Sequence, residues 1–80
     1  TEERRKEIVK NVKKICEETK ITMRNARRDA LDMLKDLKKD GTLSEDELSQ
    51  SEKEVQKMID KYTSLADSLA SSKEDEVMKV

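Results

Sequence analysis

The sequence contains no Pro, Trp, Phe or His, and Gly41 is its only glycine. The residues that usually interrupt helices are therefore missing from almost the whole chain. The lack of His removes the commonest general base near neutral pH. Cys16 is the only cysteine, which excludes an intramolecular disulfide. Because no apolar run approaches the roughly 20 residues that a membrane-spanning helix needs, we expect no contact with a membrane.

Patterns that carry catalysis or bind cofactors are also missing. The chain has no glycine-rich phosphate loop and no Cys/His spacing of a metal site. Its carboxylates are scattered along helical surfaces, where solvation is their ordinary state. Cys16 falls on an apolar stripe, which favours packing over nucleophilic chemistry. We therefore expect a protein that is not an enzyme and that needs no cofactor or metal ion.

Charged residues are abundant, at 46% of the sequence against 32% for apolar residues. This balance is typical of long, exposed helices. Disorder is not expected, because the net charge is only −1 and the apolar residues are periodic. A chain of about 80 residues builds only a thin core by itself. We therefore expect additional partners for its apolar surface, either another helix, another domain or a second copy.

The strongest local signals predict two helices joined by a short turn. Gly41 suits the left-handed residue that ends a helix, and Ser44 with Glu47 three positions later forms a capping-box pattern. The expected helices cover about 2–40 and about 45–79, with the turn at 41–44. So short a turn makes the two helices antiparallel neighbours.

Apolar residues recur on both helices at alternating spacings of three and four, as in a coiled-coil seam. On the first helix they are Val9, Val12, Cys16, Thr19, Met23, Ala26, Ala30, Met33 and Leu37, widened by Ile8, Ile15 and Leu34. On the second they are Leu48, Val55, Met58, Tyr62, Leu65 and Leu69, widened by Ile59, Ala66 and Val77. These seams are wider than one partner requires. The pattern predicts an all-α, long antiparallel hairpin that belongs to a larger bundle.

Residues 36–47 resemble a calcium-binding EF-hand loop, with Gly41 at its sixth place and Glu47 at its twelfth. However, Lys38 occupies the third place, where an oxygen ligand belongs. A helix stop followed by a helix start produces the same pattern. We therefore expect no metal site here.

Charge is divided unevenly between the two helices. Residues 1–40 hold 13 Lys and Arg against 9 Asp and Glu, whereas residues 41–80 hold 5 against 10. At about 100° per residue, seven cations share an arc of roughly 100° on the first helix. We call this arc the basic face: Lys6, Lys13, Lys20, Arg24, Arg27, Arg28 and Lys35. A solvated, salt-bridged surface is the ordinary explanation, but clustered arginines favour phosphate binding.

Several separated segments resemble the C-terminal part of the ribosome recycling factor family, over all 80 residues and without gaps. The matching segments are Thr1 to Lys6, Arg24-Asn25-x-Arg27-Arg28-Asp29-Ala30, Leu43 to Asp46, Val55-Gln56-Lys57, Asp60, and Lys73-Glu74 through Met78. The arginine-rich segment is the most specific of them. Leu31, where many bacterial members have Asn, and the Lys79-Val80 ending look more like plastid members.

The resemblance implies a three-helix bundle with a small β domain inserted between its first and second helices. Thr1 would follow the hinge, and this chain would supply the second and third helices without the first helix or the β domain. Family members bind large-subunit rRNA after termination and, with elongation factor G, split the ribosome into subunits. The bacterial cytoplasm or the plastid stroma is then the expected location. The RNA-binding candidates are Arg24, Arg27 and Arg28, which match the family's RNA-contacting arginines, together with Lys20, Lys13 and Arg5.

A generic helical coiled-coil oligomerisation module is the alternative. Such a module distributes charge along the flanks of its seam, whereas all five arginines of this chain lie on one helix. Self-association of the chain is compatible with both interpretations, because both leave apolar surface uncovered.

Overall fold

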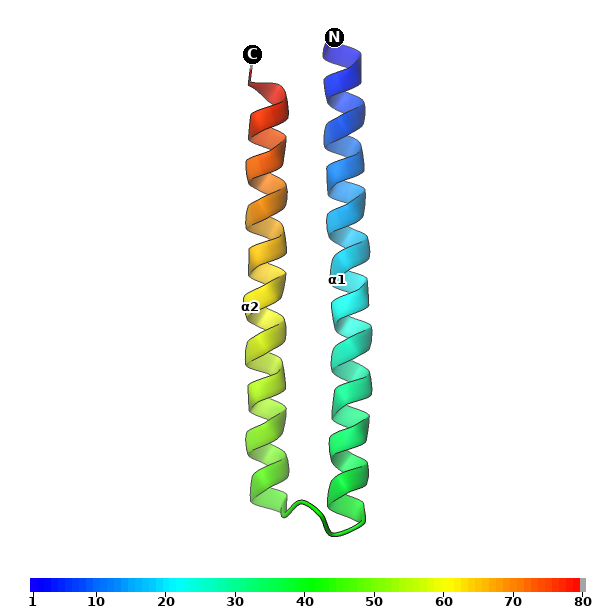
Figure 1. The fold of residues 1–80 in the computed structure, drawn as a ribbon, viewed down its shortest axis with the longest axis vertical. Coiled ribbons are helices and arrows are strands. Elements are labelled where there is room, and N and C mark those ends of the chain that lie inside the picture. Colours follow the sequence, from blue (N-terminus) through cyan, green and yellow to red (C-terminus); the bar gives the residue numbers. More distant parts are fainter. Residues whose placement is uncertain (80) are drawn as a thin grey trace.

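A computed structural model describes residues 1–79 as two long helices in an antiparallel hairpin (Figure 1). Helix α1 covers Glu2–Lys39 and α2 covers Glu45–Met78. The expected all-α hairpin is confirmed, and both ends of the chain lie at the end opposite the turn. The Cα extents are 60 × 15 × 9 Å, and the radius of gyration is 18.1 Å. A globular domain of this length has a radius of about 12 Å, so the hairpin is a rod.

Local hydrogen bonds explain where the helices begin and end. The Thr1 hydroxyl accepts from the Arg4 amide at the start of α1. Gly41 adopts a φ of 87°, and the amides of Thr42 and Leu43 reach back to the Leu37 carbonyl. The predicted capping box is present: Ser44 Oγ accepts from the Glu47 amide, and Glu47 Oε1 accepts from the Ser44 amide. These bonds satisfy backbone groups that no helical partner reaches.

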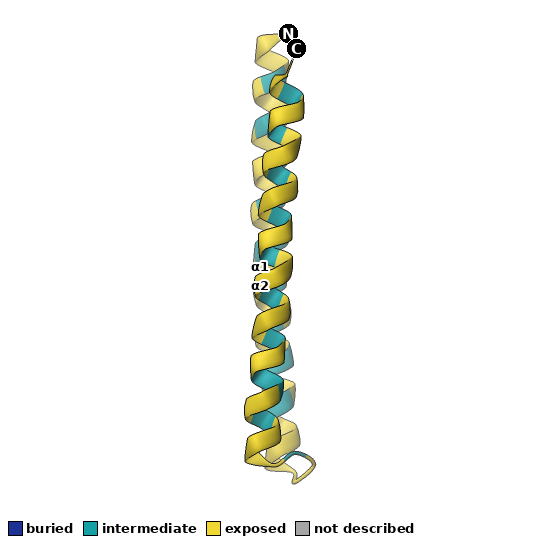
Figure 2. Cartoon of the chain, turned by 90° about the vertical axis from the view of Figure 1, so that its left-hand side faces the viewer, coloured by how far each residue is buried: buried dark blue, intermediate teal, exposed yellow. Residues whose placement is uncertain are grey.

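A line of half-buried residues, teal in Figure 2, runs along each helix where the two helices meet. On α1 these include Val9, Val12, Cys16, Thr19, Met23, Arg27, Ala30 and Leu34. On α2 they include Leu48, Val55, Ile59, Thr63, Ala66, Ala70, Glu74 and Val77. No residue among 1–79 is fully buried. Two helices without a third element can shield only one line of side chains.

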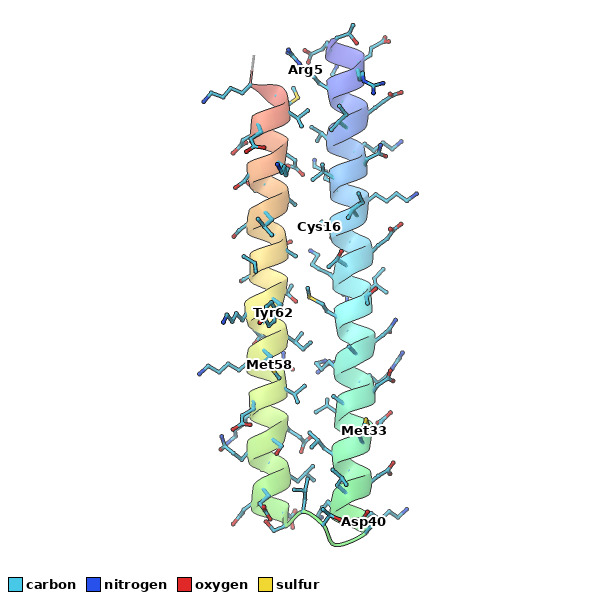
Figure 3. The ribbon with its side chains drawn as sticks, viewed as in Figure 1. Arg5, Cys16, Met33, Asp40, Met58 and Tyr62 are labelled. Carbon is cyan, nitrogen blue, oxygen red and sulfur yellow. The ribbon has the colours of Figure 1, made fainter. Side chains whose placement is uncertain are left out.

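The apolar residues predicted as one seam fall on two sides of the structure. Part of the seam forms the contact between the helices, and the rest remains exposed beside it, which we call the apolar face. The apolar face comprises Ile8, Ile15, Met33 and Leu37 of α1 with Met58, Tyr62, Leu65 and Leu69 of α2. Figure 3 shows Met33, Met58 and Tyr62 over their own helices instead of between them. The prediction that these three line the helix–helix seam was therefore wrong.

The exposed area shows how little of this chain is covered. The accessible surface is 6481 Å², whereas a globular monomer of the same mass exposes about 5,000 Å². Leu69 is 57% exposed and Ile15 is 61% exposed. Over the described residues, neither helix contains a stretch long and apolar enough to span a lipid bilayer.

Candidate functional site

The basic face of α1 lies about 160° around the helix from the apolar face, by the rotation of about 100° per residue. One edge of this face approaches α2, and Lys20 stands at that edge. Its ammonium lies 3.0 Å from Glu17 Oε1 and 3.1 Å from Asp67 Oδ1. These hydrogen bonds, first to Glu17 and then to Asp67, raise the pKa of Lys20. The Lys20 hydrogen bond lowers the pKa of Asp67. Lys20 therefore links the two helices.

Arg27 makes the second polar link across the hairpin. Its Nη1 donates to Gln56 Oε1 at 3.1 Å, and Gln56 Nε2 donates to Asp60 Oδ1 at 2.8 Å. Arg27 is half-buried, so its stem packs between the helices while its guanidinium reaches the polar side. Arg27 thus combines a fixed stem with a hydrogen-bonded charged group.

Lys13, Arg24 and Arg28 are more exposed members of the basic face. Lys13 lines a shallow groove with Glu17, Asp67 and Glu74. Arg24 lines a neighbouring groove with Glu17, Lys20 and Thr63. Arg28 Nη2 donates to Asn25 Oδ1 on its own helix at 3.0 Å. These cations stand on a continuous side of α1, where an anionic partner can reach them.

Arg5 does not join that group. It is half-buried at the contact between the helices, close to the C-terminal end of α2. Figure 3 shows Arg5 and Cys16 on the side of α1 that faces α2. The structure therefore brings Lys13, Lys20, Arg24, Arg27 and Arg28 together and places Arg5 apart from them.

Sequence reasoning missed the contribution of α2 to this site. The acids Asp60, Asp67 and Glu74 recur every seven residues on α2. Arg27, Lys20 and Lys13 recur with the same interval on α1, in the opposite chain direction. Asp67 contacts Lys20 directly, Asp60 reaches Arg27 through Gln56, and Glu74 shares a groove with Lys13. The matching intervals were available in the sequence as a signal for this pairing.

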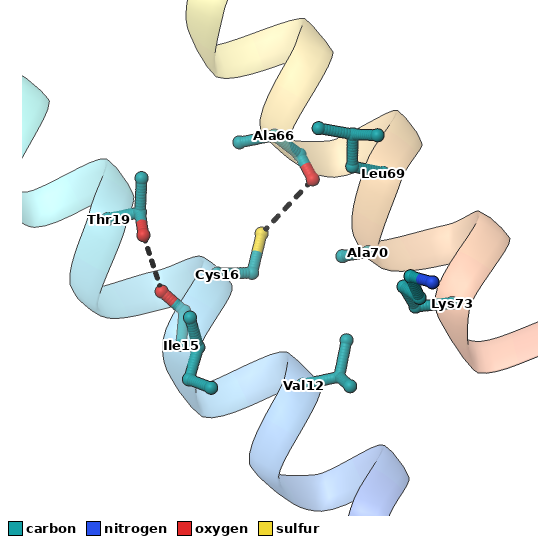
Figure 4. A pocket seen from close by; sticks show the side chains of 8 residues that line it. All are labelled: Val12, Ile15, Cys16, Thr19, Ala66, Leu69, Ala70 and Lys73. Atoms are coloured by element: carbon teal, nitrogen blue, oxygen red, sulfur yellow. Dashed lines mark hydrogen bonds between the residues drawn. The ribbon is translucent and has the colours of Figure 1, made fainter. Parts of the chain in front are cut away.

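Cys16 lies where the two helices approach each other (Figure 4). Its thiol donates weakly to the Ala66 carbonyl at 3.7 Å and to Asp67 Oδ1 at 3.6 Å. Desolvation, followed by the Asp67 hydrogen bond, raises the pKa of Cys16. A raised pKa keeps sulfur in the unreactive thiol form, so Cys16 serves packing.

A groove of about 320 Å³ opens beside Cys16 on the side of the apolar face. Figure 4 shows side chains of both helices around it. Its lining residues are Val12, Ile15, Cys16, Thr19, Ala66, Leu69, Ala70 and Lys73. Because Ile15 and Leu69 line the same groove, the exposed apolar residues of α1 and α2 belong to one surface.

The EF-hand-like segment has a different conformation from a calcium loop. Asp36 and Lys38 are still helical, because α1 continues to Lys39. Asp40 Oδ1 accepts from the Thr42 amide, and the Glu47 carboxylate caps α2. Within residues 1–79, no three Cys, Asp or Glu side chains are grouped closely enough to hold a metal ion.

Comparisons with known proteins give the same family as the arginine-rich segment. The family profile described as "Ribosome recycling factor" matches residues 1–78. The ribosome-recycling factor of Bacillus subtilis is 56% identical over all 80 residues, and that of Caldicellulosiruptor bescii is 51% identical. The chain spans 43% and 44% of those two proteins, respectively. Matches this long place the chain in a family: it belongs to the ribosome recycling factors.

Proposed function

We propose that this chain supplies the rRNA-binding helices of a ribosome recycling factor. The complete protein would bind the large subunit of the post-termination ribosome and, with elongation factor G, split the ribosome into subunits. The observation that carries the proposal is the basic face, in which Arg24, Arg27 and Arg28 stand on one side of α1. Arginine forks make bidentate contacts with phosphates and base edges. In this proposal the protein acts by binding the ribosome and separating its subunits, and no residue of the chain has a catalytic role.

The apolar face fits a missing helix of the same protein. We propose that it packs against the first helix of the family's three-helix bundle and that a small β domain completes the molecule. Met58, Tyr62, Leu65 and Leu69 follow spacings of four, three and four, which suit one long neighbouring helix. The basic face and the apolar face lie on opposite sides of the hairpin, so the RNA and the first helix do not compete for the same surface.

The expected location is the bacterial cytoplasm or the plastid stroma, the compartments that hold ribosomes of this type. The two relatives described above come from bacteria. Leu31 is half-buried in α1, and Val80 of the plastid-like ending lies outside the described residues. Neither residue is needed for the proposed RNA contact.

Binding of a full-length family member carrying this chain to isolated large subunits, measured across a salt series, tests the RNA-binding proposal. Each lost phosphate contact lowers the salt slope by about one. Arg24→Ala/Arg28→Ala should therefore weaken binding and reduce the slope by about two. The control Lys57→Ala/Lys61→Ala removes the same charge from α2. Equal losses in both double variants would contradict a recognition surface on α1.

Splitting of post-termination ribosomes with elongation factor G and GTP tests the complete activity. The Arg24→Ala/Arg28→Ala variant should split ribosomes more slowly than the parent at limiting protein concentration. Circular dichroism should show the same helix content in both proteins. A parent protein that leaves ribosomes intact under these conditions would contradict the recycling role.

A further inference from the structure

We propose that Gln56, oriented by Asp60, is a positioning residue that aims the Arg27 guanidinium at the RNA. This inference rests on the proposed RNA-binding function of the basic face. It assigns a role to α2, whose residues hold no part in the recognition surface predicted from sequence. The link consists of two hydrogen bonds in series, of 3.1 Å and 2.8 Å.

The direction of the Gln56 amide follows from the chemistry of its two neighbours. The Arg27 guanidinium can only donate hydrogen bonds, and the Asp60 carboxylate oxygen accepts them. An amide placed between them must turn its oxygen toward Arg27 and its NH₂ group toward Asp60. Both hydrogen bonds have this arrangement. Asp60 therefore prevents the flipped amide, which would point its N–H groups at the guanidinium.

A comparison with Lys20 shows why a neutral acceptor matters. Two carboxylates, Glu17 and Asp67, contact the Lys20 ammonium and offset its positive charge. Arg27 instead contacts the uncharged amide oxygen of Gln56. One Nη1 bond fixes the direction of the guanidinium, while its charge and its other N–H groups remain available to an anion. The two interhelical links therefore differ in purpose: the Lys20 link joins the helices, and the Arg27 link orients a recognition group.

Gln56→Glu is the sharpest test, because it keeps the size of the side chain and converts the orienting contact into an ion pair. In a full-length family member we expect affinity for large subunits to fall about tenfold, comparable to the loss of one good bidentate contact. The salt slope should fall by about one. The melting temperature should fall only slightly, because the introduced carboxylate can still accept from Arg27 but replaces the donor to Asp60 with a like charge. The matched control is Gln50→Glu, which makes the same charge change at a glutamine that donates to Glu54 on its own helix.

Asp60→Leu separates positioning from simple electrostatics, because it removes both the negative charge and the oxygen that accepts from the Gln56 amide. Removing a negative charge beside a basic face should strengthen RNA binding if charge alone matters. Loss of the orienting acceptor should weaken it several-fold, and this is the result that we expect. Binding by Asp60→Leu that equals or exceeds that of the parent would overturn the proposal. So would equal affinities of Gln56→Glu and Gln50→Glu.

Arg27→Ala separates the failure of this inference from the failure of the proposed function. If Arg27→Ala weakens binding while Gln56→Glu does not, the positioning role fails and the RNA-binding role stands. If the parent protein itself shows no salt-dependent binding to large subunits, the proposed function fails.

Discussion

On the polar side of the hairpin, α2 provides an acceptor for the cations of α1: Asp67 for Lys20 and Gln56 for Arg27. On the other side, Ile15 and Leu69 meet at a groove, yet each remains more than half exposed. The first side is thus completed by the chain itself. The second side leaves apolar area in water, although burial of one large aliphatic side chain contributes about 1.5–3 kcal/mol. The comparison teaches that only the apolar side requires another element.

The largest effect is expected when the apolar face has no helix to cover it. An isolated chain of these 80 residues should self-associate into a four-helix arrangement, or unfold reversibly at low concentration. Sedimentation over a concentration series checks this. Leu65→Glu/Leu69→Glu should abolish the association, because charges do not tolerate burial without partners. A stably folded monomer at micromolar concentration would contradict the requirement for a partner.

The next largest effect concerns Arg27 on the polar side. In a full-length protein, Arg27→Ala should cost about 1–3 kcal/mol of ribosome affinity, the range for a bidentate contact. Arg27→Lys should not restore binding, because an ammonium cannot replace the planar fork. Lys13→Ala should cost less and mainly reduce the salt slope, by about one. The measurement that checks this prediction is binding to large subunits, with the folding of each variant checked by circular dichroism. If Arg27→Ala folds and binds like the parent while Lys13→Ala loses binding, the recognition surface has been placed wrongly.

A smaller effect is expected from acid, and it sharpens the description of the polar side. The Lys20 hydrogen bond holds the pKa of Asp67 below its ordinary 3.8, and the Ser44 amide holds the pKa of Glu47 below 4.5. Folding lowers the pKa of both carboxyl groups. Their contribution to stability is therefore fully present above the ordinary pKa values, and it is lost as pH falls through the pKa values of the folded state. The melting temperature at fixed concentration should therefore begin to drop as pH falls below 4.5, and it should drop further below 3.8.

Asp67→Asn provides the control for that acid dependence. The variant should melt below the parent near neutral pH, and its melting temperature should change less on acidification. The raised pKa of Lys20 has the opposite sign, so its contribution persists below the ordinary 10.5 and is lost only in stronger alkali. Identical acid profiles for parent and Asp67→Asn would show that the interhelical pair contributes nothing.

No effect is expected from calcium, which tests the turn that joins the two sides. Millimolar calcium should leave the melting temperature unchanged, because Lys38 stands at a ligand place and Glu47 is engaged as a cap. A saturable rise in melting temperature would restore the EF-hand interpretation. Magnesium at equal concentration controls for ionic strength.

The helices and their ends could be predicted because local chemistry determines them. Gly41 and the Ser44–Glu47 box act within a few residues, and the structure contains both. Which apolar residues form the contact could not be predicted, since the seams are wide enough for two neighbours. Thr63 and Ala70 occupy contact positions where Tyr62 and Leu69 were expected. Small side chains let the helices approach, and that choice depends on the relative rotation of both.

The basic face was predictable from one helix, since its residues share an arc of α1. Its partners on α2 were not, because pairing Lys20 with Asp67 requires the register between the helices. That register follows from the length of the turn and from packing, neither of which composition fixes. The matching seven-residue intervals narrow the choice of partners without selecting Gln56 as the intermediary of Arg27.

The turn lies at one end of the hairpin and both termini lie at the other. The resistance of the hairpin to force therefore depends on the direction of the force. The sequence separation of its cross-helix hydrogen bonds grows with distance from the turn, from 29 at Arg27 to 51 at Cys16. Pulling the two termini apart would load these contacts one after another and open the hairpin like a zipper. A load along the 60 Å axis is instead carried by two continuous helices at once. The hairpin should therefore resist a load along its long axis better than a load that separates its two termini.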